Sequence, residues 1–216
     1  MAGATRIVTP DKVRELQIVL YRKAKAQPRY RFWSLYGELL RRDMLAGSPR
    51  TLRALELAAE TAGWGSPLPE GRARGITSSG FLGHSANVTE VSLDARGRVH
   101  VDRIVFALDC GRTVNPDLIR AQIEGGLLWG LSAAAWGEIV LGEGGEIATQ
   151  NFDTYPVIRM RSVPQMEVHL IESTEPPSGV GEVSVPSVAP ALANAIAALT
   201  GTRIRDLPFS NTIKIA

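Results

Sequence analysis

Residues 99–135 read VHVDRIVFALDCGRTVNPDLIRAQIEGGLLWGLSAAA, and two different patterns follow one another within them. From Val99 to Leu108, β-branched and aromatic residues are enriched, which predicts a strand. Asn115 and Pro116 then suit the first positions of a helix, which we expect to continue to about Ala135. A strand that leads into a long helix is typical of a domain in which a sheet packs against helices.

The same mixture of strand and helix patterns extends in both directions from this stretch. Ser48 and Pro49 suit the start of a helix that stops at Gly63, and Asp94-Ala-Arg-Gly97 predicts a hairpin turn. We therefore expect an α+β fold with a mixed sheet and packed helices. The expected elements are helices over residues 48–62, 117–135 and 186–200, strands over 75–80, 86–93, 99–108 and 166–171, a loop over 65–75 and a hairpin turn at 142–145.

The chain has 216 residues and a mass of 23.3 kDa, which suits one domain or one domain with an appendage. A hydrophobic fraction of 44% with 21% charged residues is typical of a globular protein and excludes a wholly disordered one. The single cysteine, Cys110, excludes an internal disulfide and a cysteine-only metal site. No apolar run approaches the ~20 residues that span a bilayer, and the N-terminus lacks a secretory or twin-arginine signal, so we expect a cytoplasmic chain.

Charge is distributed unevenly between the two ends of the chain. Residues 1–50 carry 11 Lys and Arg against 4 Asp and Glu, whereas residues 51–216 carry 13 against 18. We predict two domains, a basic arm of two helices over residues 1–47 and an acidic body over residues 48–216. Basic residues interleaved with aromatic ones in the arm can hold RNA phosphates and stack on bases. The alternatives are a solvated amphipathic helical pair and the fusion of two unrelated coding sequences.

Histidine and cysteine side chains give little sign of a metal site or a nucleophile. His84, His100 and His169 are far apart and follow no metal-ligand spacing. Cys110 follows Asp109, but no acyl-transfer motif surrounds it, and a small half-buried residue is the simpler interpretation. We therefore predict no metal ion held by side chains.

Two glycine-rich segments are the strongest candidates for a functional site. Gly179-Val-Gly-Glu182 places one carboxylate on a loop before a helix, where it can act as a general base. Its glycines allow unusual backbone angles and close approach by a bulky group. Gln122-Ile-Glu-Gly-Gly126 places an amide side chain, which both donates and accepts, beside bare backbone. Simpler interpretations stay open, namely an exposed glutamate in a turn and a glycine pair that allows close helix packing.

Six motifs occur in order along the body of the chain. They are Asp109-Cys-Gly-Arg-Thr-Val-Asn-Pro116, Gln122-Ile-Glu-Gly-Gly126, Asn151-Phe-Asp-Thr-Tyr-Pro156, Glu175-Pro-Pro-Ser-Gly-Val-Gly-Glu182, Ala189-Pro-Ala-Leu-Ala-Asn-Ala195 and Leu207-Pro208. As a series, they resemble the C-terminal part of the large subunit of xanthine dehydrogenase-family molybdenum hydroxylases. The isoquinoline 1-oxidoreductase β-subunit and the related aldehyde oxidases are the most similar type. The resemblance runs from about Ser48 to the C-terminus.

This resemblance implies a role for each matching residue. Glu182 corresponds to the family's active-site glutamate, the base that deprotonates the hydroxide ligand on molybdenum. Gln122 corresponds to the glutamine that hydrogen-bonds the molybdopterin. Gly179, Val180 and Gly181 correspond to residues that shape the approach to the metal.

The resemblance also implies a fold, a cofactor and partners. The fold is the family's molybdenum cofactor-binding domain in truncated form, and the cofactor is molybdenum–molybdopterin in its cytosine dinucleotide form. The implied reaction hydroxylates an electron-poor carbon of an N-heterocycle or aldehyde with water. The partners are an iron–sulfur small subunit, since one cysteine here holds no cluster, and the missing part of the large subunit, without which we expect no activity. Val183-Ser-Val185 departs from the family's Pro-containing stretch, so the resemblance leaves this part of the loop unpredicted.

The basic end of the chain resembles a different family. Leu20-Tyr-Arg-Lys-Ala-Lys-Ala-Gln-Pro-Arg-Tyr-Arg-Phe-Trp-Ser-Leu-Tyr36 and Arg41-Arg-Asp-Met-Leu45 are similar to the extreme N-terminus of group II intron reverse transcriptases, over residues 1–45. In that family the segment helps to hold intron RNA. The two resemblances together imply a chimeric reading frame joined near residues 45–48. The alternatives are an RNA-binding module that acts through the arm and a non-functional remnant.

Overall fold

The computed structural model describes residue 45, residues 47–80 and residues 82–216 of the chain. The chain divides into two units between Ala46 and Gly47, and the described fold is that of the second unit. The basic arm over residues 1–47 lies almost entirely outside the described residues. Its two helices, its boundary and its contact with RNA therefore stay predictions.

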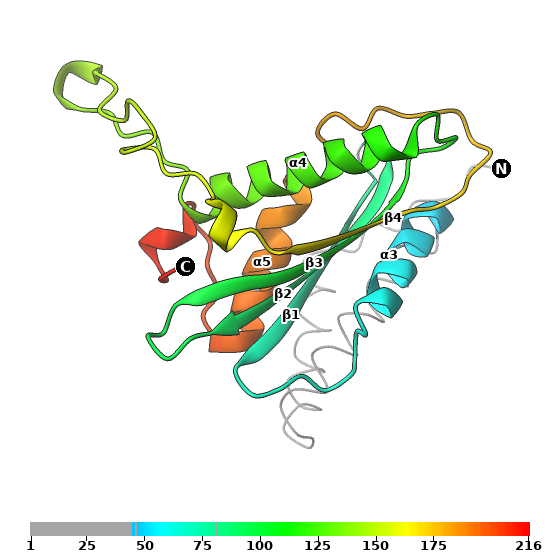
Figure 1. Cartoon of the computed structure of the whole chain (residues 1–216), viewed down its shortest axis with the longest axis horizontal. Helices are drawn as coiled ribbons and strands as arrows, with labels where there is room; N and C mark the ends of the chain where they lie inside the picture. The colour runs from blue at the N-terminus through cyan, green and yellow to red at the C-terminus, as the bar shows by residue number, and fades with distance from the viewer. Residues whose placement is uncertain (1–44, 46, 81) are drawn as a thin grey trace, which may run out of the picture. The chain divides into compact units, whose positions relative to one another are not determined.

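A mixed sheet of four strands lies at the centre of this unit (Figure 1). Neighbouring strands β1, β2 and β3 are antiparallel, whereas β4 pairs parallel to β3. The parallel pairing follows from the connection, because a helix between β3 and β4 returns the chain to the same end of the sheet. The expected α+β class with a mixed sheet is confirmed. The strands, in sheet order, are β1 (Arg72–Ser79), β2 (His84–Leu93), β3 (Val99–Asp109) and β4 (Gln165–Leu170).

Helices cover both faces of the sheet (Figure 1). Helix α3 (Pro49–Thr61) packs on one face, and α4 (Pro116–Ala135) and α5 (Val185–Thr200) pack on the other. Asn115 begins α4 as expected, because its side chain accepts a hydrogen bond from the Leu118 nitrogen at 3.0 Å. None of the helices in the described part of the chain has the length and hydropathy needed to cross a membrane.

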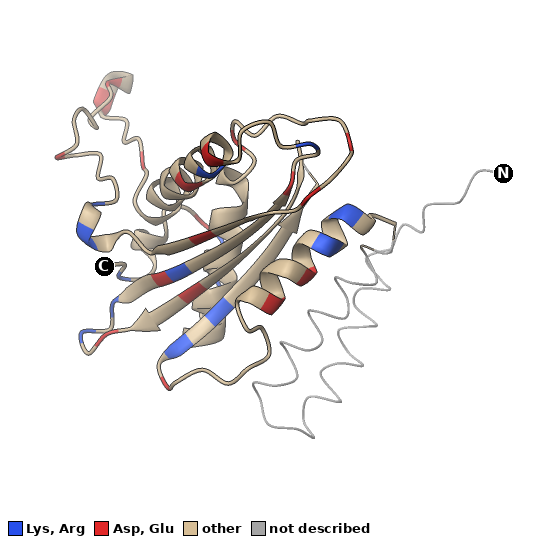
Figure 2. Ribbon diagram, turned by 45° about the vertical axis from the view of Figure 1, so that its right-hand side comes forward, with Lys and Arg blue, Asp and Glu red and all other residues tan. Residues whose placement is uncertain are grey.

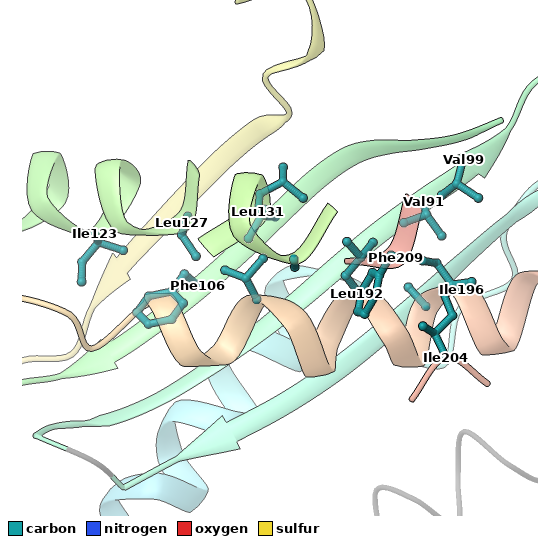
Figure 3. Packing of buried hydrophobic residues seen from close by; sticks show 14 of the residues in the cluster. Val91, Val99, Phe106, Ile123, Leu127, Leu131, Leu192, Ile196, Ile204 and Phe209 are labelled. Carbon is teal, nitrogen blue, oxygen red and sulfur yellow. The ribbon is translucent and has the colours of Figure 1, made fainter. Parts of the chain in front are cut away.

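The main core lies between the sheet and the pair α4 and α5 (Figure 3). Phe106 of β3, Leu127 of α4 and Leu192 of α5 belong to this core, and all three side chains are fully buried. Gly130 lets the two helices approach closely, because a Cβ atom there would lie 2.8 Å from the Val185 carbonyl oxygen. The prediction of close packing at the α4 glycines is therefore confirmed at Gly130.

Ion pairs connect neighbouring strands, and one of their arginines also bonds the C-terminus of α3. Figure 2 shows basic and acidic residues side by side on neighbouring strands. Arg103 of β3 donates two hydrogen bonds to Glu167 of β4, at 2.7 and 2.9 Å. These bonds lower the pKa of the Glu167 carboxyl group. Arg103 also donates to the Thr61 carbonyl oxygen at 3.2 Å. A guanidinium at this position satisfies a carbonyl at the C-terminus of α3 and complements the helix dipole.

One detail of the sequence prediction is confirmed and two are wrong. The hairpin turn at residues 142–145 is present, because Leu141 and Ile147 form an antiparallel bridge and the Gly142 nitrogen donates to the Glu146 carbonyl oxygen at 2.7 Å. This exposed hairpin extends away from the sheet (Figure 1). Strand β1 begins at Arg72, within the loop that we expected up to residue 75, because Arg72 and Arg74 both bond Glu90 on β2. Cys110 is fully buried rather than half-buried, and burial raises the pKa of its thiol.

Candidate functional site

The two glycine-rich segments singled out in the sequence lie against each other in the structure. Gln122, on the first half of α4, donates a hydrogen bond from Nε2 to the Gly181 carbonyl oxygen. Ser184, just after the second segment, donates from Oγ to the Ile123 carbonyl oxygen at 3.1 Å. The loop before α5 and the start of α4 therefore form one local structure, which we call the α4–α5 junction (residues 118–129 and 179–184).

Glu182 lies on the exposed side of this junction. Its carbonyl oxygen accepts a hydrogen bond from the Val185 nitrogen at 3.0 Å, which leads the chain into α5. Among the residues that the structure describes, none donates a hydrogen bond to its carboxylate. The carboxylate is thus exposed and held by its backbone alone, one residue after the carbonyl group that Gln122 bonds.

Open space lies above the backbone at three glycines of the junction. A Cβ atom built on Gly125, Gly179 or Gly181 would meet no atom within 4 Å. Neither Gly179 nor Gly181 has a positive φ, so the expected unusual backbone angles are absent and open access is what these glycines provide. Val180 differs, because its side chain is half-buried and packs against the core. Its position suits it to anchor the loop rather than to contact a bound group.

The departure at Val183-Ser-Val185 does not leave the loop unsupported. Val183 is fully buried, and the Ser184 hydroxyl bonds α4 as described above. The Ser187 hydroxyl in turn donates to the Ser184 carbonyl oxygen at 2.6 Å. Hydrogen bonds from two buried hydroxyl groups thus hold this part of the loop in place, where the family has a proline.

The outward face of α4 carries a stripe that the sequence reading missed. Leu118, Gln122, Gly125 and Trp129 are spaced by four, three and four residues, so they share one face of the helix. Leu118 is 68% exposed and Trp129 is 72% exposed, which is unusual for side chains of this size. Counting helical positions outward from Gln122 would have found this stripe, in which an amide is surrounded by apolar groups.

The three histidines lie on three different strands, β2, β3 and β4. His84 bonds the Thr51 hydroxyl at 2.7 Å, and His100 lies 3.2 Å from the Asp94 carboxylate. Among the residues that the structure describes, no group of three His, Cys, Asp or Glu side chains is placed to hold a metal ion.

Adjacent glycines on α4 offer a matched test of this packing. A Cβ atom at Gly126 would overlap with the buried Ser184 hydroxyl, whereas one at Gly125 meets nothing within 4 Å. We expect Gly126→Ala to lower the free energy of unfolding by about 1–3 kcal/mol. We expect Gly125→Ala to raise it by up to about 1 kcal/mol, because alanine favours the helix. Urea denaturation of both variants checks this, and equal effects would contradict the described packing.

Comparison with known proteins supplies the identity of this fold. Residues 46–164 match the family model described as "Molybdopterin cofactor-binding domain". The chain belongs to this family. It is a molybdopterin cofactor-binding domain of the large subunits of xanthine dehydrogenase-family molybdenum hydroxylases, which are oxidoreductases, and it is similar to the isoquinoline oxidoreductase β type.

Relatives and solved structures agree with this assignment. Isoquinoline 1-oxidoreductase subunit beta of Brevundimonas diminuta is 34% identical over 167 residues, 75% of this chain and 21% of the relative. A second relative, from Gluconacetobacter polyoxogenes, is named membrane-bound aldehyde dehydrogenase (pyrroloquinoline-quinone). It is 31% identical over 209 residues, which are 89% of this chain and 26% of the relative. The crystal structure of quinoline 2-oxidoreductase from Pseudomonas putida 86 is 21% identical with a TM-score of 0.54, over 59% of this chain and 17% of that one, and shows the fold.

The extent of these matches bears on the organisation of the chain. The chain spans about a fifth to a quarter of the length of these two relatives. The family model begins at residue 46, close to the predicted junction, but the match that covers 89% of the chain extends into residues before 48. The chimeric origin of residues 1–45 stays a prediction.

Proposed function

We propose that this domain binds the molybdenum–molybdopterin cofactor at the α4–α5 junction and serves the hydroxylation of an N-heterocycle or aldehyde carbon, with Glu182 as the general base. One observation carries the proposal. The bond from Gln122 to Gly181 brings an exposed amide, an exposed carboxylate and three open glycines to the same place. All of these residues except Gly125 are ones that the family resemblance assigns to the cofactor and to catalysis.

The residues of the junction suit the cofactor. Gln122 uses one N–H on Gly181 and keeps its second N–H and its carbonyl oxygen for a ligand rich in heteroatoms. The open backbone at Gly179 and Gly181 admits a bulky group that any side chain would obstruct. The cytosine dinucleotide form of molybdopterin is the form that we propose for this chain.

Proton transfer is the task that this proposal gives to Glu182. When bound, the cofactor supplies oxygen transfer to carbon and accepts the electrons of the oxidation. The Glu182 carboxylate takes up the proton that the attacking oxygen loses, and a general base of this kind contributes about 10²–10⁴-fold to a rate. Gln122 holds the loop at Gly181, the residue before the base, and so fixes the position from which the proton is taken up.

The exposed apolar face indicates that other polypeptide covers this domain in the working enzyme. Leu118 and Trp129 of α4 are exposed, and so are Phe152 and Met160 farther along the chain, at 67% and 89%. Apolar surface of this kind marks interaction sites. Because the matches cover only about a fifth to a quarter of each relative, we propose that the rest of a large subunit packs on these apolar side chains and that the domain is inactive without it. An iron–sulfur small subunit is the further proposed partner, which takes the electrons onward.

Molybdenum content tests the cofactor proposal directly. We expect about one molybdenum per chain, by elemental analysis, in protein purified from its own host together with its partners. Gln122→Leu is expected to lower this occupancy about tenfold under limiting cofactor, since it removes hydrogen bonds to the pterin. Gly125→Ala tests the open backbone and is expected to lower occupancy without loss of stability.

Gln165→Leu, on the exposed start of β4, is the matched control and is expected to keep full occupancy. A folded, partner-bound wild-type protein without molybdenum would overturn the proposal, as would equal occupancy in the Gln122 and Gln165 variants.

A further inference from the structure

The chain that leads to Glu182 lies along the turn at the end of β3. The Arg112 nitrogen donates to the Glu175 carbonyl oxygen at 2.9 Å, and the Ser178 nitrogen donates to the Cys110 carbonyl oxygen at 2.8 Å. The Ser178 hydroxyl also donates to the Cys110 carbonyl oxygen, at 3.2 Å. The turn of residues 109–112 therefore holds the segment of residues 175–178, which ends four residues before the proposed base.

Gly111 makes this contact tight. It has a φ of +77°, and a Cβ atom there would overlap with the Pro176 carbonyl oxygen and lie 2.8 Å from the Glu175 carbonyl oxygen. The turn and the segment thus touch backbone to backbone. A small change in the conformation of the turn has to move the segment with it, because no flexible side chain lies between them.

A charged pair from another element fixes the conformation of the turn. Arg50, in the first turn of α3, donates to Asp109 from Nε at 2.8 Å and from Nη2 at 2.6 Å. The same carboxylate accepts a bond from the Gly111 nitrogen at 3.0 Å. Arg50 and these bonds hold the pKa of the Asp109 carboxyl below its usual range, and the Asp109 side chain is only 4% exposed.

The location of Arg50 shows that this pair is more than a surface contact. A cation in the first turn of a helix opposes the helix dipole, and carboxylates are favoured there instead. Helix α3 has no acidic residue in its first turn, and the Arg50 side chain pairs instead with Asp109 of β3. The pair therefore anchors the end of β3 to α3. Arg50 without Asp109 would destabilise the start of the helix, because its charge opposes the helix dipole.

We infer that Arg50 and Asp109 are positioning residues for the Glu182 loop. The pair fixes the turn of residues 109–112, the turn holds residues 175–178, and this places the upstream end of the loop, while Gln122 and Ser184 place its downstream end. The assignment of catalysis to Glu182 rests on the proposed function, whereas the mechanical link from Arg50 to Ser178 does not.

The chain contains a matched control for this inference. Arg103 and Glu167 form a second two-bond arginine–carboxylate pair, across β3 and β4. Its arginine also bonds α3, at Thr61, so it too joins the sheet to that helix. It bonds no residue of the turn or of the loop. Loss of this second pair affects the stability of the fold and leaves the turn in place.

Amide hydrogen exchange of the full chain separates positioning from general stability. In Asp109→Asn, we expect the Arg112 and Ser178 amides to exchange about tenfold faster relative to the core amides of α5 in the same sample, since a charge-assisted bond is lost locally. In Glu167→Gln we expect no such relative change. The same relative exchange in both variants would overturn the inference.

Two further measurements keep the test decisive. If Asp109→Asn does not fold, Arg50→Lys keeps the charge but gives up the two-bond geometry, and we expect a smaller increase at the same two amides. No increase there would overturn the inference.

In an active assembly, Asp109→Asn is expected to lower kcat about tenfold with KM nearly unchanged, and Glu167→Gln is expected to change neither. Wild-type protein without molybdenum would count against the proposed function alone, because the exchange result does not depend on the cofactor.

Discussion

Replacing Gly75 by alanine is expected to prevent the domain from folding. Gly75 lies in β1 beneath α5, and a Cβ atom there would overlap with the Ala191 carbonyl oxygen and the Ala195 nitrogen. It would also lie 2.9 Å from the Asn194 carbonyl carbon. All three atoms belong to the helix backbone, so no side chain can rotate away. Overpacking typically costs about 1–3 kcal/mol even where side chains adjust, and we expect more than about 4 kcal/mol here.

A loss of this size is a large share of the stability of an ordinary domain, which is about 5–15 kcal/mol. Circular dichroism and chemical denaturation of the purified variant measure it. Gly97→Ala is the control, since Gly97 has a φ of +70° in the exposed β2–β3 turn and its Cβ would meet nothing. That variant is expected to lose about 1–2 kcal/mol from backbone strain alone. Similar stabilities for the two variants would show that α5 does not lie as close to β1 as described.

Replacing Glu182 by glutamine is expected to abolish most turnover of an active assembly. The change keeps the size of the side chain but removes the proton acceptor, so we expect kcat to fall by about 10²–10⁴-fold. Stability and molybdenum content are expected to stay at the wild-type level, because Glu182 is exposed and the described residues donate no bond to its carboxylate. Steady-state kinetics, elemental analysis and thermal unfolding on the same sample measure the three quantities.

Glu60→Gln is the matched control for this prediction. Glu60 is an exposed glutamate on α3, which packs on the opposite face of the sheet from α4 and α5. We expect its kcat to equal that of the wild type. An unchanged kcat for Glu182→Gln would refute the assignment of the base, and a loss of molybdenum together with kcat would indicate that Glu182 supports cofactor binding instead.

Much of the fold can be predicted from local patterns in the sequence. Helix α4 begins at Pro116 and ends at Ala135, as Asn115 and the apolar spacing predict, and α5 ends before Gly201 as expected. The turn at residues 94–97 joins β2 to β3 as predicted. These features succeed because caps, turns and periodicity are determined by neighbouring residues.

Features that depend on distant residues were missed. The start of β1 at Arg72 follows from ion pairs with Glu90, and an arginine in a strand gives no local signal. Arg50 and Asp109 are 59 positions apart, and neither is unusual in its local sequence. Contacts of this kind become visible only when the elements are placed in space.

The candidate site could be predicted from the sequence only in part. Residues alone single out Glu182 and Gln122 but leave open an exposed turn and a helix-packing glycine pair, and the assignment of roles comes from the family resemblance. The structure separates the glycines, because Gly126 and Gly130 pack against α5 while Gly125 stays open. It also shows that Gly181 and Gln122 are bonded, which no spacing along the chain indicates.

The close contact between α4 and α5 has a consequence for thermal fluctuation. Gly126 meets Ser184 and Gly130 meets the Val185 backbone, so the two helices have no compressible layer of side chains between them at this end. A displacement of one helix is transmitted almost undiminished to the other. The backbone segments that carry Gln122 and Glu182 are therefore expected to move together as a rigid body. Vibrations of the sheet beneath them change the orientation of these two segments more than the separation between them.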